Sequence, residues 1–286
     1  MRQLMNILTG ALRRRGAMLV FSGAALAFIP AAQATLSYVN GNFATLNCGV
    51  VQVTCTNGAG QLGYNTDVTG WVNQSSGGNL GYNFLYTGAS SATSGANGDA
   101  GAVALWPGTG PVLSNPPVGG PNFIAADGAY HAAAIQQTIT GVTPGALYAV
   151  GFYWAAAQQN GFTGATTEQW QVTLTDGTNT TTKSTSVLPN TSQGFTGWFY
   201  QIFDFTATSL TETLSFLSVG TPISPSEPPF ALLADVSFAQ APEPGSLSLG
   251  IGGLGLIATA RVLSKRRSKH LKAGGTIAKD GEAGAR

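Results

Sequence analysis

Residues 35–239 are predicted to fold as one all-β sandwich domain. Short runs of alternating apolar and polar residues follow one another along this stretch, separated by turn residues and without a convincing helical period. Only 9% of the 286 residues are charged and 39 are glycine, so Ser, Thr, Asn and Gln supply most of the polarity. Such a composition suits an extracellular β protein better than a cytosolic enzyme.

The N-terminal residues 1–34 are predicted to be a cleavable signal peptide. Arg13, Arg14 and Arg15 precede an apolar stretch over 17–29. Ala32 and Ala34 then provide the small residues that a signal peptidase requires, which predicts cleavage before Thr35. The expected partners are the Sec translocon and signal peptidase. The alternative is an uncleaved anchor helix.

The next stretch contains both cysteines of the chain, Cys48 and Cys55. An even number of cysteines in an exported segment favours one disulfide between them, which closes a small loop. A metal pair is the alternative, but no nearby His or second Cys pair completes four ligands. The residues 58–122 are rich in Gly, Ser and Asn, and we expect weak strands and long loops there.

Six stronger strand patterns follow, over 135–140, 147–154, 169–175, 198–205, 213–219 and 231–238. Alternation assigns their faces, because successive side chains of a strand point to opposite sides. Over 198–205 the phenylalanines 199, 203 and 205 oppose Trp198, Tyr200 and Ile202. We therefore expect one of these faces to pack in the core and the other to meet a loop or a ligand.

Several short motifs occur in the order found in galactose-binding-like jelly rolls. They are Val39-Asn-Gly-Asn-Phe43, Ile135-Gln-Gln137, Pro144-Gly-Ala-Leu-Tyr148, Phe205-Thr-Ala-Thr-Ser209, Leu214-Ser-Phe216 and Leu233-Ala-Asp-Val236. The chain resembles these modules, which are common in carbohydrate-binding proteins, over most of 38–238. The resemblance implies a jelly-roll β-sandwich of eight or nine strands with adjacent termini. It also implies a structural Ca²⁺ near Asp235, although Ala44 replaces the acid expected of the first strand.

The C-terminal part has three segments in order. Pro242, Glu243 and Pro244 come first, an apolar run over 247–260 follows, and Arg261 and a basic block at 265–267 end it. Residues 240–267 resemble the PEP-CTERM sorting signal of exopolysaccharide-producing Gram-negative bacteria. The resemblance implies processing by an exosortase. We expect a transmembrane helix over about 246–263 in the inner membrane and a polar cytoplasmic tail over 268–286. The glycines at 250, 252 and 255 match a dinucleotide fingerprint by chance, since no βαβ unit surrounds them.

Charge excludes nucleic acid as a partner of the domain. Positions 35–240 carry the single base Lys183 against nine acids, a net charge of −8 with no arginine to bind phosphates.

Catalytic residue patterns are sparse. His131 is the only histidine of the domain, and it is read as a hydrogen-bonded surface residue. A glycosidase needs two facing carboxylates, and the domain offers only the isolated glutamates 168, 212 and 227. The sequence therefore predicts no catalytic residues and no enzyme.

Flat aromatic side chains are the candidate sugar-binding residues. Trp198 and Tyr200 share the face that the phenylalanines leave free, and Trp71 and Trp106 lie in loop-like stretches. Core packing is the competing interpretation for all four. The leading expectation is an exported, non-enzymatic protein that associates with extracellular polysaccharide. It is expected to be held transiently in the inner membrane and then to reach the cell surface or matrix. A secreted glycan hydrolase and a ligandless structural matrix protein are the alternatives.

Overall fold

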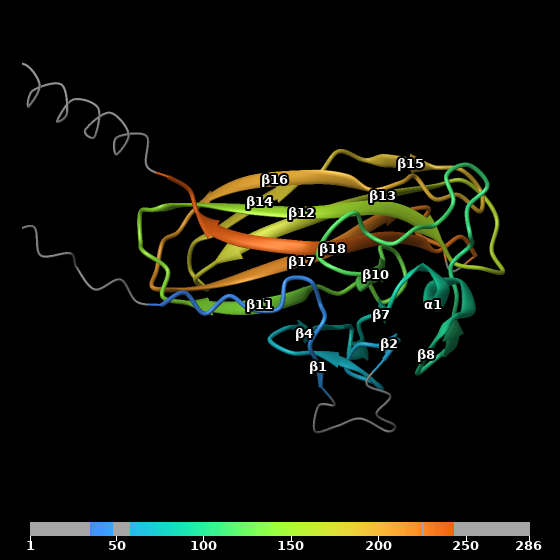
Figure 1. Ribbon diagram of the computed structural model, residues 1–286, viewed down its shortest axis with the longest axis horizontal. Helices are drawn as coiled ribbons and strands as arrows, with labels where there is room; N and C mark the ends of the chain where they lie inside the picture. Colours follow the sequence, from blue (N-terminus) through green and yellow to red (C-terminus); the bar gives the residue numbers. More distant parts are fainter. Residues whose placement is uncertain (1–34, 48–57, 225, 243–286) are drawn as a thin grey trace, which may run out of the picture. The chain divides into compact units, whose positions relative to one another are not determined.

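The computed structural model describes residues 35–47, 58–224 and 226–242. Two six-stranded antiparallel sheets pack face to face in this part of the chain (Figure 1). The first sheet has the order β16 (Phe199–Thr206), β12 (Leu147–Gln158), β18 (Pro229–Gln240), β10 (Phe123–Asp127), β7 (Asn83–Tyr86) and β2 (Gly60–Gln61). The second has the order β14 (Thr180–Ser184), β13 (Thr166–Thr175), β17 (Thr211–Thr221), β11 (Ile135–Thr140) and β4 (Val72–Asn73), with β15 (Leu188–Asn190) also paired to β13. The predicted all-β sandwich is confirmed.

Short elements complete the described part. Three two-stranded ribbons pair β1 (Leu46–Asn47) with β3 (Asp67–Val68), β5 (Ser75–Ser76) with β6 (Asn79–Leu80), and β8 (Ala96–Gly98) with β9 (Gly101–Val103). The helix α1 (Ala89–Ser94) precedes β8. The weak strands and long loops expected over 58–122 are thus present. The count of eight or nine sandwich strands is too low, because pieces of two or three residues such as β2, β4 and β15 extend both sheets.

The six strong patterns all form strands. In β13 and β17 the pattern follows from burial of one face. Along β13 buried and partly buried residues alternate without interruption, as they do over most of β17. Trp170 of β13 is fully buried, and its indole Nε1 donates to the backbone oxygen of Leu232 on the facing sheet at 3.0 Å. The main core therefore lies between the two sheets, and it includes Phe152, Phe205 and Phe216.

A second apolar cluster lies on the outer face of the first sheet. Phe84 and Tyr86 of β7, Phe123 of β10 and Leu232 of β18 point away from the main core and are buried under α1, β8, β9 and the following loop. Consequently β12 is buried on both faces near its end, where small residues occupy positions 155–157. This covering reaches only part of the sheet and leaves the outer face near β16 open.

The two described ends of the chain lie at the same end of the sandwich (Figure 1). The Tyr38 hydroxyl donates to the backbone oxygen of Val236 at 2.6 Å, and Ala241 N–H donates to the oxygen of Leu147 at 2.8 Å. The adjacent termini implied by the jelly-roll resemblance are confirmed for these residues.

Several sequence predictions concern residues outside the described part. These are the signal peptide, the Cys48–Cys55 disulfide, Glu243 and Pro244 of the sorting motif, and the transmembrane helix. Among the described residues, no helix is long and apolar enough to span a bilayer. Pro242 is described and is exposed just beyond β18.

Candidate functional site

The open part of the first sheet carries a pair of neighbouring tyrosines whose rings are tilted against each other. Tyr153 of β12 and Tyr200 of β16 are direct cross-strand partners, and their ring centroids lie 5.1 Å apart at 53°. Tyr200 is 57% exposed, and Tyr153 is partly buried beside the second cluster. We call these two residues, with Gly151 and Ser237 beneath them, the tyrosine platform.

Gly151 determines how the Tyr200 ring lies. A Cβ atom built on this glycine would stand 2.4 Å from the Tyr200 hydroxyl oxygen, 2.8 Å from the Ser237 Oγ and 3.2 Å from the Tyr200 Cζ. The end of the Tyr200 ring therefore lies directly over the bare backbone of Gly151 instead of standing upright on the sheet. The Ser237 hydroxyl donates to the Gly151 oxygen at 3.2 Å and keeps its lone pairs free.

Trp198 lies on the same face as Tyr200, as the alternation predicts, but it is not a free platform. Its ring packs edge-on against Phe123 and Phe195, at centroid distances of 5.6 and 6.2 Å. Its indole Nε1 donates to the Ser114 backbone oxygen at 2.9 Å. Trp198 thus closes the edge of the second cluster beside the platform.

Trp71 lies in the core, as the competing interpretation holds, and not on an exposed sugar-binding surface. Its ring is 6% exposed and lies in the main core, between Tyr38, Phe43 and Phe216. Its indole Nε1 donates to the Asn40 oxygen at 3.1 Å, so the polar end of the buried ring has a partner.

Trp106 has a positioning role in the structure. It is partly buried, and its Nε1 donates to the backbone oxygen of Phe162 at 2.8 Å. Its own N–H donates to the Gln158 oxygen at 2.9 Å. These bonds hold the segment after β12, which forms one wall of the pocket described below.

Asp235 lies in a β-bulge of β18, where the pairing with β12 shifts register. Its φ is +47°, and its carboxylate approaches Gly119, so that a Cβ built on this glycine would stand 2.4 Å from Oδ1. Among the described residues, no group of three His, Cys, Asp or Glu side chains could hold a metal ion. Ca²⁺ is bound by six to eight oxygens, to which backbone carbonyls and water also contribute, so a calcium ion near Asp235 stays a prediction.

Two buried acids have strongly perturbed protonation. Burial raises the pKa of Asp127 to about 7, against two backbone hydrogen bonds that lower it. Burial raises the pKa of Glu168 to about 9, with a smaller contribution from the charge of Asp127, while a hydrogen bond from the Thr166 hydroxyl at 2.5 Å lowers it. One oxygen of each carboxyl group, Oδ2 of Asp127 and Oε2 of Glu168, is buried without a hydrogen-bond partner in the described structure.

The other two glutamates make local contacts of their own. Glu212 accepts bonds from the N–H groups of Thr208 and Ser209, at 2.6 and 3.0 Å, and so stabilises a turn. Glu227 packs against Gly164. His131 stacks on Tyr130 with the ring centroids 4.0 Å apart.

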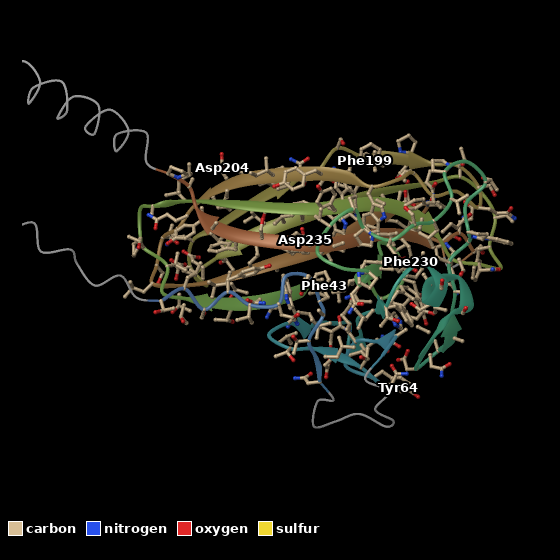
Figure 2. The ribbon with its side chains drawn as sticks, in the orientation of Figure 1. Phe43, Tyr64, Phe199, Asp204, Phe230 and Asp235 are labelled. Carbon is tan, nitrogen blue, oxygen red and sulfur yellow. The ribbon has the colours of Figure 1, made fainter. Side chains whose placement is uncertain are left out.

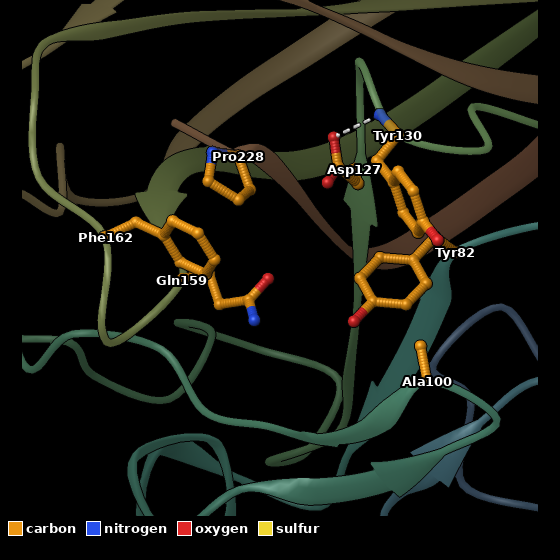
Figure 3. A pocket seen from close by; sticks show the side chains of 7 residues that line it. All are labelled: Tyr82, Ala100, Asp127, Tyr130, Gln159, Phe162 and Pro228. Carbon is orange, nitrogen blue, oxygen red and sulfur yellow. Dashed lines mark hydrogen bonds between the residues drawn. The ribbon is translucent and has the colours of Figure 1, made fainter. Parts of the chain in front are cut away.

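Asp127 opens into a pocket of about 310 Å³ (Figure 3). The residues that line it come from separate segments of the chain: Tyr82, Ala100, Asp127, Tyr130, Gln159, Phe162 and Pro228. Figure 3 shows Asp127 and the two tyrosines on one side of the opening and Phe162, Gln159 and Pro228 on the other. Glu168 is not part of this lining.

Sequence reasoning missed the pocket. Tyr82 lies in the Gly- and Ser-rich stretch without a readable period, and Asp127 ends a buried strand that was not recognised. The one available signal was the turn sequence Asp127-Gly-Ala-Tyr130, since an Asp before Gly commonly caps a turn with its own side chain.

Comparisons with known proteins give only distant structural matches. No protein-family model matches the chain, and no curated protein matches its sequence. A xylan-binding family 22 module of Paenibacillus barcinonensis Xyn10C is 10% identical, with a TM-score of 0.33 over 71% of this chain and 93% of that one. A family 28 module specific for non-crystalline cellulose is 10% identical, with a TM-score of 0.31 over 61% and 90%.

The N-terminal cellulose-binding domain of a Cellulomonas fimi glucanase is 14% identical, with a TM-score of 0.27 over 51% of this chain and 93% of that one. The described part of the chain is a β-sandwich with distant structural similarity to carbohydrate-binding modules.

Proposed function

We propose that the chain is an exported, non-enzymatic jelly-roll protein that binds extracellular polysaccharide through its tyrosine platform. The observation that carries the proposal is the Tyr200 ring, which is 57% exposed, paired with Tyr153 and lying over the bare backbone of Gly151. An exposed aromatic ring held flat against a sheet offers its face to a partner.

The chemistry of this surface suits a neutral sugar chain. The apolar face of a sugar ring packs on a flat aromatic ring, and the Ser237 hydroxyl beside it can accept a hydrogen bond. The excess of nine acids over one base in 35–240 leaves the domain acidic even with Glu168 protonated, which disfavours anionic partners.

Binding without hydrolysis is favoured by the placement of the acids. A glycosidase positions two carboxyl groups on either side of the bond that it cleaves. In the described structure the pocket is lined by one carboxyl group, that of Asp127. Glu168, the other buried acid, lies outside the lining.

Replacing Tyr200 with Ala is expected to weaken retention on the producer's own polysaccharide several-fold while leaving the fold intact. A stacked aromatic contact contributes about 1 kcal/mol, and a loss of 1.4 kcal/mol is about tenfold in affinity. Affinity electrophoresis of the exported protein in gels containing the polysaccharide measures the change. The matched control is Tyr64→Ala, because Tyr64 lies far from Phe199 at the start of β16 (Figure 2).

Gly151→Ala provides a second variant that leaves both tyrosines in place. The new Cβ would collide with the free end of the Tyr200 ring and with the Ser237 Oγ, so the ring would have to lift from the sheet. We expect the same loss of retention as in Tyr200→Ala. Unchanged retention in both variants, or no retention of the wild type on any polysaccharide tested, would leave only a structural role.

We further propose that the chain is routed by its two ends, as the sequence predicts. Mass spectrometry of the exported protein is expected to show an N-terminus at Thr35 and loss of the segment that follows Pro242-Glu243-Pro244. Replacing these three residues with alanine should retain the protein in the inner membrane. A mature protein that keeps residues 1–34, or a sorting variant released normally, would contradict this routing.

A further inference from the structure

The pocket beside Asp127 contains a buried acceptor that the protein itself leaves unused. Asp127 is 1% exposed, and its Oδ1 accepts N–H groups of Ala129 and Tyr130 at 2.8 and 3.0 Å. Its Oδ2 has no partner in the described structure (Figure 3). A buried carboxylate oxygen without a hydrogen-bond donor costs folding free energy. A ligand that donates a hydrogen bond to Oδ2 would remove this cost and bind more tightly for it.

Other polar groups of the pocket are also free. Within the described residues, the side-chain amide of Gln159 and the hydroxyls of Tyr82 and Tyr130 form no hydrogen bonds. In Figure 3 the Tyr82 hydroxyl and the Gln159 amide point into the opening from opposite sides. The pocket therefore offers both donors and acceptors to a ligand with several hydroxyl groups.

The remaining lining is flat and apolar. Tyr82 and Tyr130 meet edge to face, with centroids 5.1 Å apart at 90°, and Phe162 and Pro228 form the opposite wall. Aromatic faces next to convergent polar groups suit a ring that has C–H faces and a hydroxyl rim.

The walls are held in place before any ligand arrives. Asp127 N–H donates to the Tyr82 oxygen at 3.1 Å, and Tyr82 N–H donates to the His131 oxygen at 3.2 Å. The Trp106 indole Nε1 donates to the backbone oxygen of Phe162 and so fixes the wall that carries the Phe162 ring. Such preorganisation lowers the entropy lost on binding.

We propose that this pocket binds one neutral sugar residue, the end of a glycan chain, with Asp127 Oδ2 accepting its hydroxyl groups. The site is separate from the tyrosine platform and goes beyond the function proposed for it. Its volume of about 310 Å³ is at the lower limit for small-molecule sites, which suits one ring and not a continuing chain. A cation would leave the Gln159 amide donors unused, and an acidic sugar would face the Asp127 charge.

The test measures binding of methyl glycosides of glucose, galactose and mannose to the exported protein by saturation-transfer NMR and calorimetry. At least one of these neutral sugars is expected to bind saturably. Asp127→Asn, which keeps the Oδ1 acceptor of the turn, is expected to weaken binding about tenfold or more, because hydrogen bonds to charged groups are among the strong ones. Tyr130→Ala, at a residue 37% exposed, should weaken it several-fold. The exposed Asp204→Asn removes the same charge elsewhere and should change nothing.

The pH profile separates a ligand contact from a structural role. The titratable groups near the Asp127 carboxyl are Tyr82, Tyr130 and Glu168. The charge of Asp99 also contributes to the raised pKa of Tyr82. Because the pKa of Asp127 is about 7, binding should strengthen as the pH rises through that value, and Asp127→Asn should lose this dependence.

Each outcome decides the proposal. Absence of binding by every neutral glycoside overturns it, as does saturable binding of tetramethylammonium or glucosamine alone. Unchanged sugar affinity in both Asp127→Asn and Tyr130→Ala also overturns it. The result is independent of the platform, because Tyr200→Ala should leave glycoside binding intact and Asp127→Asn should leave retention on polysaccharide measurable.

Discussion

Raising the pH from about 5 to about 8 is expected to destabilise the domain, and Glu168→Gln is expected to remove most of this effect. Glu168 and Asp127 are buried acids whose pKa values in the folded state are about 9 and about 7. In the unfolded chain both groups return to ordinary pKa values near 4.

The sign follows from proton binding. Between about pH 4 and the folded-state pKa values, the unfolded chain has released protons that the folded domain still holds. The unfolded state therefore binds fewer protons, and the free energy of unfolding falls as the pH rises across this window. Below about pH 4 both states are protonated and the penalty is absent.

Glu168→Gln keeps an oxygen that can accept the Thr166 hydroxyl but cannot ionise. At about pH 8 the variant should be more stable than the wild type by on the order of a few kcal/mol, and at about pH 4 by much less. Urea unfolding followed by circular dichroism over this pH range measures both slopes. Asp204→Asn, at the surface, serves as the control. Equal slopes in the wild type and in Glu168→Gln would contradict the assignment.

The second half of the domain could be predicted from the sequence because its strands alternate cleanly. The strand over 135–140 was predicted with its observed bounds, and β13 and β17 were found but were longer than expected. In these strands one face meets the main core, so apolar and polar residues alternate and the strand can be predicted from the sequence.

The first half resisted prediction for a physical reason. Both β7 and β10 are buried on their two faces, between the main core and the second cluster, so alternation disappears. The segment 87–122 covers them with loops, one short helix and one two-stranded ribbon. Such a segment has no regular hydrophobic period that could be read from the sequence.

The candidate sites depend on contacts that a single sequence does not reveal. The face of Tyr200 followed from alternation, but its flat orientation depends on Gly151 in the neighbouring strand. The pocket joins Tyr82, Asp127 and Phe162, which are far apart in sequence and meet only through sheet pairing and loop closure. The turn-rich residues around Trp71 left a surface position and a core position both open, and its contacts with Tyr38, Phe43 and Phe216 place the ring in the core.

Replacing Trp71 with Ala is expected to cost about 3–5 kcal/mol of stability, a value typical of a large aromatic residue removed from a core. The ring fills the space between Tyr38, Phe43 and Phe216 and ties the first described segment to the second sheet. Its loss leaves a cavity and also removes the hydrogen bond to the Asn40 oxygen.

Thermal and urea unfolding of the Trp71→Ala, Trp71→Phe and Tyr200→Ala variants test this placement together. Trp71→Phe should be intermediate, since it keeps an aromatic ring but loses the indole N–H. Tyr200→Ala should change stability little, because its ring is 57% exposed, and should act on polysaccharide retention instead. A Trp71→Ala protein of normal stability that no longer binds polysaccharide would show that Trp71 belongs to the binding surface after all. Loss of stability in Trp71→Ala and loss of retention in Tyr200→Ala would separate the core tryptophan from the platform tyrosine.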